Sequence, residues 1–316
     1  MKYFLFLPFT ILIITSYSQT IEKYYNYNWK ECDASEARFY SIMKKTDLGW
    51  HRQDYFITKK SLQMDGYYED KDCKIRNGKF HFFYANDKLE YEGSYVKDKK
   101  EGLWLSYHYN GVMSDSSYYY KGERVGTSIG WYSNGFISDS SVLDSTGKGV
   151  FVSWFDNGVP SSAGRYSDGK KQDGKWKYYH KNGQISDIEI YKEGTLIDKK
   201  YFDETGTFIA DTTTKEIEAA FTGGVKGWQK YLFKHLYFPS QYKIVNADKA
   251  VVVVDFEVKE EGNIENVFVS TPFYPEFDKI ALEVIAKSPK WIPALQNNRH
   301  VKYRARQAVI FSQEEF

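Results

Sequence analysis

The stretch that decides the fold is EGLWLSYHYNG, residues 101–111, because nearly the same phrase returns 72 residues later as DGKWKYYHKNG, residues 173–183. Aligned on an early glycine, five copies share this pattern at a spacing of 24, 24, 23 and 25 residues. Their glycines are Gly78, Gly102, Gly126, Gly149 and Gly174. A fixed period of this length is the signature of a repeat architecture. The middle of the chain is therefore predicted to be an array of one structural unit.

Each copy carries aromatic residues and a turn pair at constant positions. The turn pairs are Asn110-Gly111, Asn134-Gly135, Asn157-Gly158 and Asn182-Gly183, and Asn86-Asp87 takes the same place in the first copy. Asn-Gly between β-forming runs predicts a hairpin with a type I′ turn. Because a lone hairpin is marginal in water, we expect the units to pair into one elongated antiparallel sheet with aromatic ladders on its faces.

Weaker copies flank these five and extend the predicted array to residues 54–210. The segment DYFITKKSLQMDGYYED places Phe56, Leu62 and Tyr68 in the repeat columns, and YFDETGTFI places Phe202 and Phe208 there. Degenerate terminal units are typical of the caps of a stacked array. Ahead of them, DASEARFYSIMKK predicts a short helix with Asp33 as N-cap and Glu36 three residues on, within a helical cap region over residues 19–53.

The glycine, aromatic and Asn-Gly pattern of residues 54–210 resembles the MORN-repeat variant family. This resemblance is carried by the columns described above. It implies a non-catalytic scaffold.

The N-terminal segment has the composition of a signal peptide over residues 1–18. Lys2 is followed by an apolar run over residues 4–14, and Ser16 and Ser18 are small residues suited to a cleavage site before Gln19. The run is shorter than the roughly 20 residues of a spanning helix, and no later run is long enough. We therefore expect an exported protein, periplasmic or secreted, without a stable membrane span after signal removal.

Export gives the two cysteines a predicted role. Cys32 and Cys73 are the only cysteines of the chain, and in an oxidising compartment they are expected to form one disulfide that closes a loop of about 40 residues. Metal binding is the less favoured alternative, because two cysteines without nearby histidines make a poor site.

Composition limits the class of partner. The chain carries 43 basic and 42 acidic residues, a net charge of +1, so nothing calls for nucleic acid or an anionic surface as a global partner. Aromatic residues make up 18% of the chain, which favours a folded protein over a disordered one. About 300 mature residues predict about two domains.

After residue 210 the period stops and a different pattern begins. The sequence predicts a helix ending before Pro239, strands over residues 249–258 and 264–271, a helix over residues 275–288 and a final strand over residues 300–311. The expected fold class is therefore mostly β, with an elongated sheet of stacked hairpins followed by a compact α+β domain over residues 211–316.

Residues 217–312 resemble the C-terminal domain of the TonB energy transducers. The resemblance is carried by Tyr237, Pro239, the Val-rich strand and EEGNIENV, then by Phe277-Asp278, Ala281 and SPKWIPALQNN with Trp291 and Pro293. It implies a protein partner in the cell envelope, such as a TonB-dependent outer-membrane transporter, bound by pairing with the last strand. The partner-binding residues expected on that ground are Tyr303, Arg304, Ala305, Arg306 and Gln307.

No constellation of residues indicates chemistry. The six histidines have no metal-ligand spacing, no Gly-x-Ser-x-Gly elbow is present, and the aligned Asp115, Asp139 and Asp187 are more simply solvated strand positions. No catalytic residue, metal or cofactor is expected, and the chain is not predicted to be an enzyme. The favoured function is an envelope protein-interaction module with the array as spacer. The alternative is a glycan or peptidoglycan binder that uses exposed aromatic ladders, whereas buried ladders favour the first function.

Overall fold

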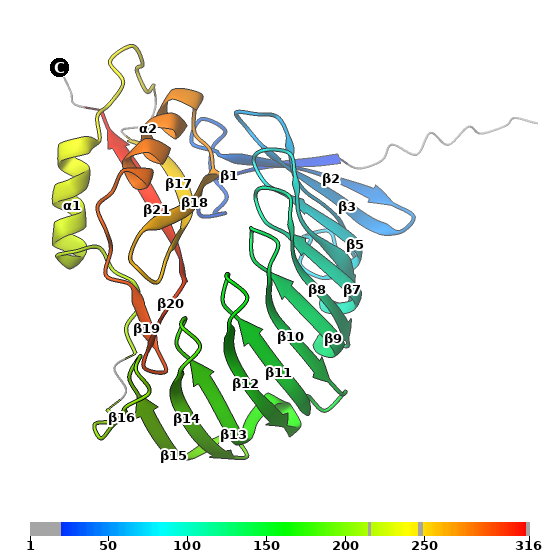
Figure 1. The fold of residues 1–316 in the computed structure, drawn as a ribbon. Coiled ribbons are helices and arrows are strands. Elements are labelled where there is room, and N and C mark those ends of the chain that lie inside the picture. The colour runs from blue at the N-terminus through cyan, green and yellow to red at the C-terminus, as the bar shows by residue number, and fades with distance from the viewer. Residues whose placement is uncertain (1–19, 214–215, 246–248, 314–316) are drawn as a thin grey trace, which may run out of the picture.

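The computed structural model describes residues 20–213, 216–245 and 249–313, so the signal peptide predicted over residues 1–18 lies outside the described residues. The chain forms one 16-stranded antiparallel sheet, here called the repeat sheet, and a C-terminal domain with two helices and a small sheet. In Figure 1 the repeat sheet bends around the C-terminal domain, from β1–β3 near β17 and β18 to β14–β16 below β19 and β20. The mostly β fold class is confirmed.

The repeat sheet is a meander in which every strand pairs with the next along the chain. Its first eight strands are β1 (Thr20–Tyr25), β2 (Phe39–Thr46), β3 (Gly49–Phe56), β4 (Leu62–Tyr68), β5 (Arg76–Phe83), β6 (Leu89–Val96), β7 (Lys99–Tyr107) and β8 (Met113–Tyr120). The other eight are β9 (Glu123–Trp131), β10 (Ile137–Leu143), β11 (Gly149–Trp154), β12 (Pro160–Ser167), β13 (Lys171–Tyr179), β14 (Ile185–Lys192), β15 (Thr195–Phe202) and β16 (Phe208–Ile209), with the short 3-10 helix η1 (Asp168–Lys170) between β12 and β13.

The Asn-Gly pairs are hairpin turns, but their type differs from the type I′ turn expected. Gly111 has a φ of +91°, whereas Asn110 is not among the residues with positive φ. The N–H of Gly111 donates to the carbonyl of His108, and the N–H of His108 donates to the carbonyl of Val112. This is a three-residue loop with glycine in the left-handed position, so only one residue of each pair needs positive φ. Several of the turns at the other ends of the strands have two consecutive positive φ values, as at Lys121 and Gly122 between β8 and β9.

The asparagine of the turn links one hairpin to the next. The Asn110 side chain accepts a hydrogen bond from the N–H of Val112 at 3.0 Å and donates to the carbonyl of Ser133 at 2.8 Å. The same pair of bonds is made by Asn86, Asn134 and Asn182. Asn therefore recurs because its amide satisfies its own turn and a carbonyl of the following repeat at once.

Aromatic rings cover glycines on the neighbouring strand. The ring of Trp104 lies over Gly93, and a Cβ placed on that glycine would come within 2.2 Å of it. Phe80 covers Gly66 and Trp176 covers Gly164 in the same way. Trp104 and Trp176 are each only 2% exposed and Phe80 is fully buried, so these three rings lie within the packed interior. Glycine and aromatic columns are thus complementary halves of one packing unit.

The helix predicted over residues 33–45 is wrong. Asp33 and Glu36 form only one turn, in which the N–H of Glu36 donates to the carbonyl of Asp33 at 3.1 Å. From Phe39 onward the chain is strand β2, in which Phe39, Ser41 and Met43 are buried and alternate with partly exposed residues. Every second residue is therefore buried where the strand pairs with β1 and β3, and this pairing decides the local structure in place of the helix N-cap pattern. Residues 20–53 continue the sheet and do not form a helical cap.

The predicted disulfide is not formed in the structure, which holds Cys32 and Cys73 as separate thiols. Cys73 is buried in the apolar cluster of the first hairpins, beside Met43, Trp50 and Tyr68. That burial raises the pKa of the Cys73 thiol to about 11. Cys32 is partly exposed in the connection between β1 and β2. Cys73 therefore acts as a small apolar core residue.

The C-terminal domain consists of α1 (Gly224–His235), β17 (Lys249–Val258), β18 (Ile264–Thr271), α2 (Pro275–Ala286), β19 (Ala294–Gln296), β20 (Arg299–Val301) and β21 (Tyr303–Ser312). Its three-stranded sheet has the order β18-β17-β21, with β17 in the centre. One face of β17 packs on α2, whose Phe277, Ile280, Ala281, Val284 and Ile285 are buried as the sequence predicts. The final strand of the prediction is interrupted at Lys302, because β19 and β20 form a separate hairpin.

Candidate functional site

The last strand, β21, is an edge strand with one paired side. It pairs with β17 in an unbroken antiparallel register from Tyr303 opposite Val258 to Ser312 opposite Lys249. No strand among the described residues pairs with its other side. A strand in this position presents a row of backbone donors and acceptors to which an extended segment can add.

The five residues predicted to bind a partner divide between two faces of β21. Tyr303, Ala305 and Gln307 are partly buried, and the first two pack against the core of the domain. Arg304 and Arg306 are on the opposite face. Arg306 forms a bidentate ion pair with Asp255, with 3.0 Å from Nε to Oδ1 and 3.1 Å from Nη2 to Oδ2. Asp255 stands opposite Arg306 in the strand register, so the strand pairing itself brings the two charges together.

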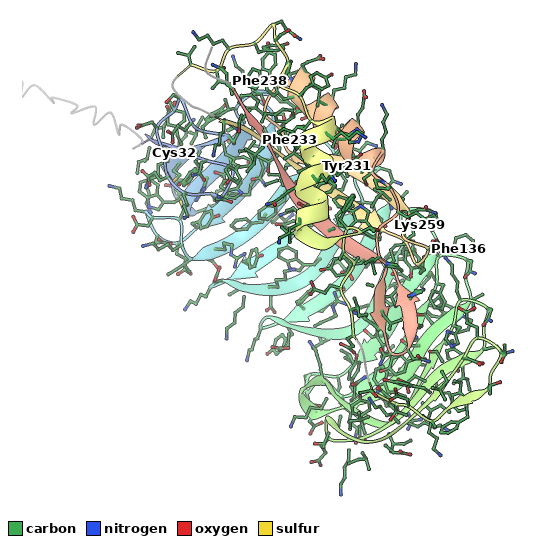
Figure 2. All side chains as sticks on the ribbon, turned by 90° about the vertical axis from the view of Figure 1, so that its left-hand side faces the viewer. Cys32, Phe136, Tyr231, Phe233, Phe238 and Lys259 are labelled. Atoms are coloured by element: carbon green, nitrogen blue, oxygen red, sulfur yellow. The ribbon has the colours of Figure 1, made fainter. Side chains whose placement is uncertain are left out.

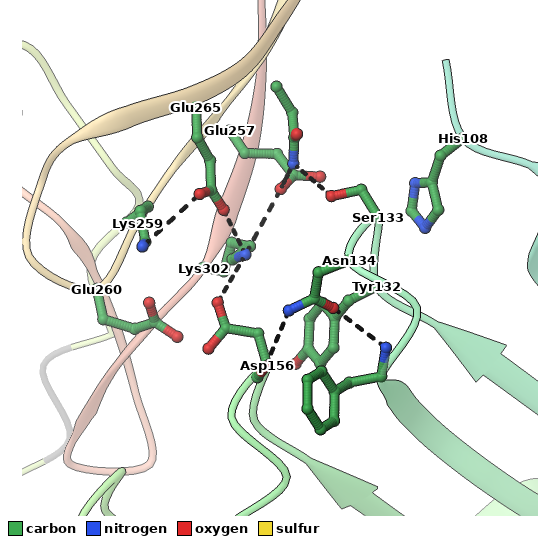
Figure 3. Close-up of polar contacts among 12 residues, drawn as sticks. His108, Tyr132, Ser133, Asn134, Asp156, Glu257, Lys259, Glu260, Glu265 and Lys302 are labelled. Carbon is green, nitrogen blue, oxygen red and sulfur yellow. Dashed lines mark hydrogen bonds and ion pairs between the residues drawn. The ribbon is translucent and has the colours of Figure 1, made fainter. Parts of the chain in front are cut away.

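Lys302 is the centre of an ion cluster that joins the C-terminal domain to the repeat sheet (Figure 3). Its Nζ lies 3.2 Å from Asp156 Oδ2 and also contacts Glu257 and Glu265. Burial disfavours the charged lysine, but the hydrogen bond that Lys302 donates to Glu265 and the charges of the surrounding carboxylates outweigh it and raise the pKa of Lys302. Lys181 adds a second bridge, 3.1 Å from Asp156 and 3.2 Å from Glu260. No sequence pattern indicates this cluster, because its members lie on separate elements.

The β19–β20 hairpin inserts against the other end of the repeat sheet. Its turn residues Asn297 and Asn298 have φ values of +48° and +58°, and Asn298 donates to the carbonyl of Phe202 at 3.0 Å. Arg299 is buried over the ring of Tyr178, 5.2 Å from its centroid. Burial lowers the pKa of Arg299 to about 10. This hairpin was not predicted, although two consecutive asparagines between short β-forming runs are a signal for it.

Two buried carboxylates lie on the repeat sheet beside this hairpin. Asp187 is fully buried, and its carboxylate oxygens have no hydrogen-bond partner. Burial, together with the nearby Glu189, raises the pKa of Asp187 to about 7. Glu189 accepts a hydrogen bond from Tyr191 at 2.8 Å and lies 3.5 Å from the amide of Asn297. Asp187 is therefore not the solvated strand position that the sequence suggested.

Aromatic residues pack between the C-terminal domain and the middle of the repeat sheet. The ring of Phe268 stacks on Tyr109 with 4.4 Å between centroids and meets Tyr84 edge to face at 5.5 Å. Nearby, Asn266 donates to the hydroxyl of Ser133 at 3.0 Å. Two cavities of about 150 and 300 Å³ flank the stack, and both are lined by Tyr84, Phe268 and Arg304. The C-terminal domain is thus fixed to the repeat sheet by charge, by hydrogen bonds and by ring stacking.

Two histidines of the repeat sheet, His108 and His180, have structural partners. His108 and His180 each bond a backbone carbonyl of the following hairpin, that of Trp131 at 2.7 Å and that of Phe202 at 2.9 Å. Across residues 20–213, 216–245 and 249–313, no group of three or more His, Cys, Asp or Glu side chains could hold a metal ion. Within the same part of the chain, no helix is long and apolar enough to cross a membrane.

A comparison with protein families matches the C-terminal part of the chain. Residues 234–312 match the family model described as Gram-negative bacterial TonB protein C-terminal. No curated protein matches the chain. The matched segment runs from the last turn of α1 to the end of β21 and so contains the whole three-stranded sheet. Over these residues the chain is similar to the C-terminal domain of TonB proteins, which suggests a protein-interaction role in the cell envelope.

Proposed function

We propose that this protein is a non-catalytic interaction module of the cell envelope, exported to the periplasm or beyond. Its TonB-type domain captures an extended segment of an outer-membrane or periplasmic protein, such as a TonB-dependent transporter, along β21. The observation that carries the proposal is the open edge of β21, whose other side is held in register by ten residue pairs with β17. Main-chain hydrogen bonds to such an edge supply affinity without needing a particular partner sequence.

Recognition rests on the backbone of β21 more than on its basic side chains. Arg306 and Lys302 are already neutralised by carboxylates of this chain, Asp255 for the first and Asp156 and Glu265 for the second. Acidic residues in the partner therefore add less affinity than they would if these basic side chains were unpaired. The burial of Trp104 and of Trp176 supports this function over glycan binding by an exposed aromatic stripe.

The repeat sheet, which we propose to be a MORN-variant array, orients the domain and does not act as a spacer. Contacts with the domain extend along its curve, from the ring of Phe273 under Arg38 to Phe202 at the far end. An array that only separated two modules would not need them. The edge of β21 is thus presented in one fixed orientation.

Two proline variants test the edge. The variants are Ala305→Pro and Ala308→Pro. Successive N–H groups of a strand point to opposite edges, and these two residues are three positions apart, so their N–H groups point to different edges. One proline therefore removes a donor to β17, and the other removes a donor to the open edge. The open-edge variant is expected to keep a melting temperature near that of wild type. Partners are first identified by crosslinking in the envelope and mass spectrometry. The proposal predicts that the open-edge variant loses them, and undiminished capture by that folded variant contradicts it.

A further inference from the structure

Helix α1 exposes an apolar and basic face that the contacts described above do not use. Phe233 is 92% exposed, Val225 74% and Tyr237 61%. Trp228, on the other side of the helix, is buried in the core with Phe221 and Trp291. Single exposed apolar residues are ordinary, but a Phe side chain in nearly complete contact with water, within a cluster of others, is not.

The charged residues of α1 form a row beside this apolar cluster. Lys226, Lys230 and Lys234 are four residues apart and follow one line along the helix, and all three are exposed. Val225 and Phe233, eight residues apart, fall on the adjacent line of the helix, and Tyr237 lies just beyond its C-terminal end. None of the three lysines forms an ion pair with a described residue.

The local charge contrasts with the balance of the whole protein. The chain has 43 basic and 42 acidic residues, but residues 219–247 contain four lysines and neither Asp nor Glu. The basic charge around α1 is therefore not compensated within this stretch. Charge complementarity requires an anionic partner.

The position of α1 leaves this face accessible to an extended surface. Figure 1 places the helix on the side of the C-terminal domain that faces away from the repeat sheet. Figure 2 shows it on the face turned to the viewer, with Phe233 on it and the repeat sheet behind. The open edge of β21 belongs to the sheet behind the helix, so the two surfaces are separate.

We propose that this face of α1 binds the surface of an anionic lipid membrane. A side chain as prominent as Phe233 would need a matching pocket in a protein partner, whereas the headgroup region of a bilayer can enclose it from all sides. Tyr237 suits the same boundary, with its ring toward the acyl chains and its hydroxyl in the headgroup layer. The lysine stems lie along the apolar surface while their ammonium groups meet lipid phosphates. The protein is thus a peripheral membrane protein through α1, independently of the role of β21.

Vesicle sedimentation of the full chain tests the proposal. Wild type is expected to sediment with vesicles of equal parts phosphatidylcholine and phosphatidylglycerol, to bind pure phosphatidylcholine much less, and to dissociate as salt is raised. Each lysine near a charged membrane contributes about fivefold in affinity, so changing Lys226, Lys230 and Lys234 together to Gln should weaken binding roughly a hundredfold. Phe233→Ser should weaken it about tenfold.

Matched controls separate this face from net charge and general hydrophobicity. Lys175, Lys192 and Lys200 are exposed lysines on the repeat sheet, and their joint change to Gln alters the charge equally. Leu48, 75% exposed in the turn between β2 and β3, is the apolar control through Leu48→Ser. Both controls should bind like wild type. The proposal is overturned if wild type binds neutral and anionic vesicles equally, or if the α1 lysine variant binds as tightly as wild type. Either result is expected if the true occupant of this face is an acidic protein.

Discussion

Lys302 and Asp156 are 146 residues apart in the sequence, yet their side chains form an ion pair with 3.2 Å between Nζ and Oδ2. Asp156 belongs to a hairpin turn of the repeat sheet, and Lys302 precedes the edge strand of the TonB-type domain. The pair therefore fixes the orientation of that edge relative to the repeat sheet. Burial opposes ionisation of Asp156, but hydrogen bonds from Lys181 and Lys302 outweigh it and lower its pKa.

Lys302→Met should lower the free energy of unfolding by about 2 kcal/mol, because it leaves Asp156, Glu257 and Glu265 without their shared cation. The exposed Lys279 of α2, changed to Met, is the control and should have little effect. The folded-state pKa of Lys302 is raised, so its contribution is fully present below the ordinary lysine pKa of about 10.4 and is lost as pH rises from there through the raised folded-state pKa. That of Asp156 is lowered, so its contribution is lost as pH falls below about 4. Urea unfolding at neutral pH measures the difference, and equal stability of both variants would contradict the cluster.

Gly93→Ala should destabilise the repeat sheet by about 2 kcal/mol, because the new methyl group would overlap the ring of Trp104. Ser94, the next residue, points to the opposite face and provides the control Ser94→Ala. Thermal unfolding measures both. A melting temperature for Gly93→Ala equal to that of the control would show that the ring does not depend on the glycine.

Asn110→Ala should cost about 1–2 kcal/mol, because it removes the hydrogen bond within the turn and the bond to the carbonyl of Ser133. Asn157 is a matched control, since its side chain bonds only the N–H of Val159 in its own turn. Asn157→Ala should therefore cost about half as much. Equal losses in urea unfolding would mean that the bond between hairpins contributes nothing.

Gly111→Val should destabilise the protein by more than about 1 kcal/mol, because the glycine has a φ of +91° that a β-branched residue resists. Gly111→Asn should cost less, since asparagine tolerates this conformation. Calorimetric melting of the two variants gives the comparison. The explanation fails if valine is tolerated as well as asparagine.

Asp187→Asn should change how stability depends on pH. In the folded state the pKa of Asp187 is raised from 3.8 to about 7, so the folded protein holds a proton there that the unfolded chain releases. Stability of the wild type therefore falls as pH rises through this window. The variant should match wild type near pH 4 and exceed it by about 1 kcal/mol or more at pH 8. Parallel stability profiles across that range would exclude an ionisable Asp187.

The sequence by itself determined the repeat sheet and the main elements of the TonB-type domain. Strands end at Tyr107 and Tyr179 and resume at Met113 and Ile185, in the columns that the repeat defines. The strands of the repeat sheet were predictable because the spacing of the aromatic residues and the turn residues are local features of the sequence. They recur in five copies, so each copy supports the prediction for the others. Where one local signal stood alone, as in the helix expected from Asp33 and Glu36, pairing with neighbouring strands prevailed.

Only the tertiary structure decided how the two parts meet. Lys302 and Asp187 each looked like an ordinary strand residue, and no pattern marked Arg299. The partners of Lys302 and Arg299 lie on the repeat sheet, and the pKa of Asp187 depends on its burial in the fold. Contacts between residues more than a hundred positions apart leave no periodic trace in a single sequence. For the same reason the sequence could predict the strand β21 but could not show that Arg306 is neutralised by Asp255 of the same chain, nor that the outer backbone edge of β21 is unpaired among the described residues.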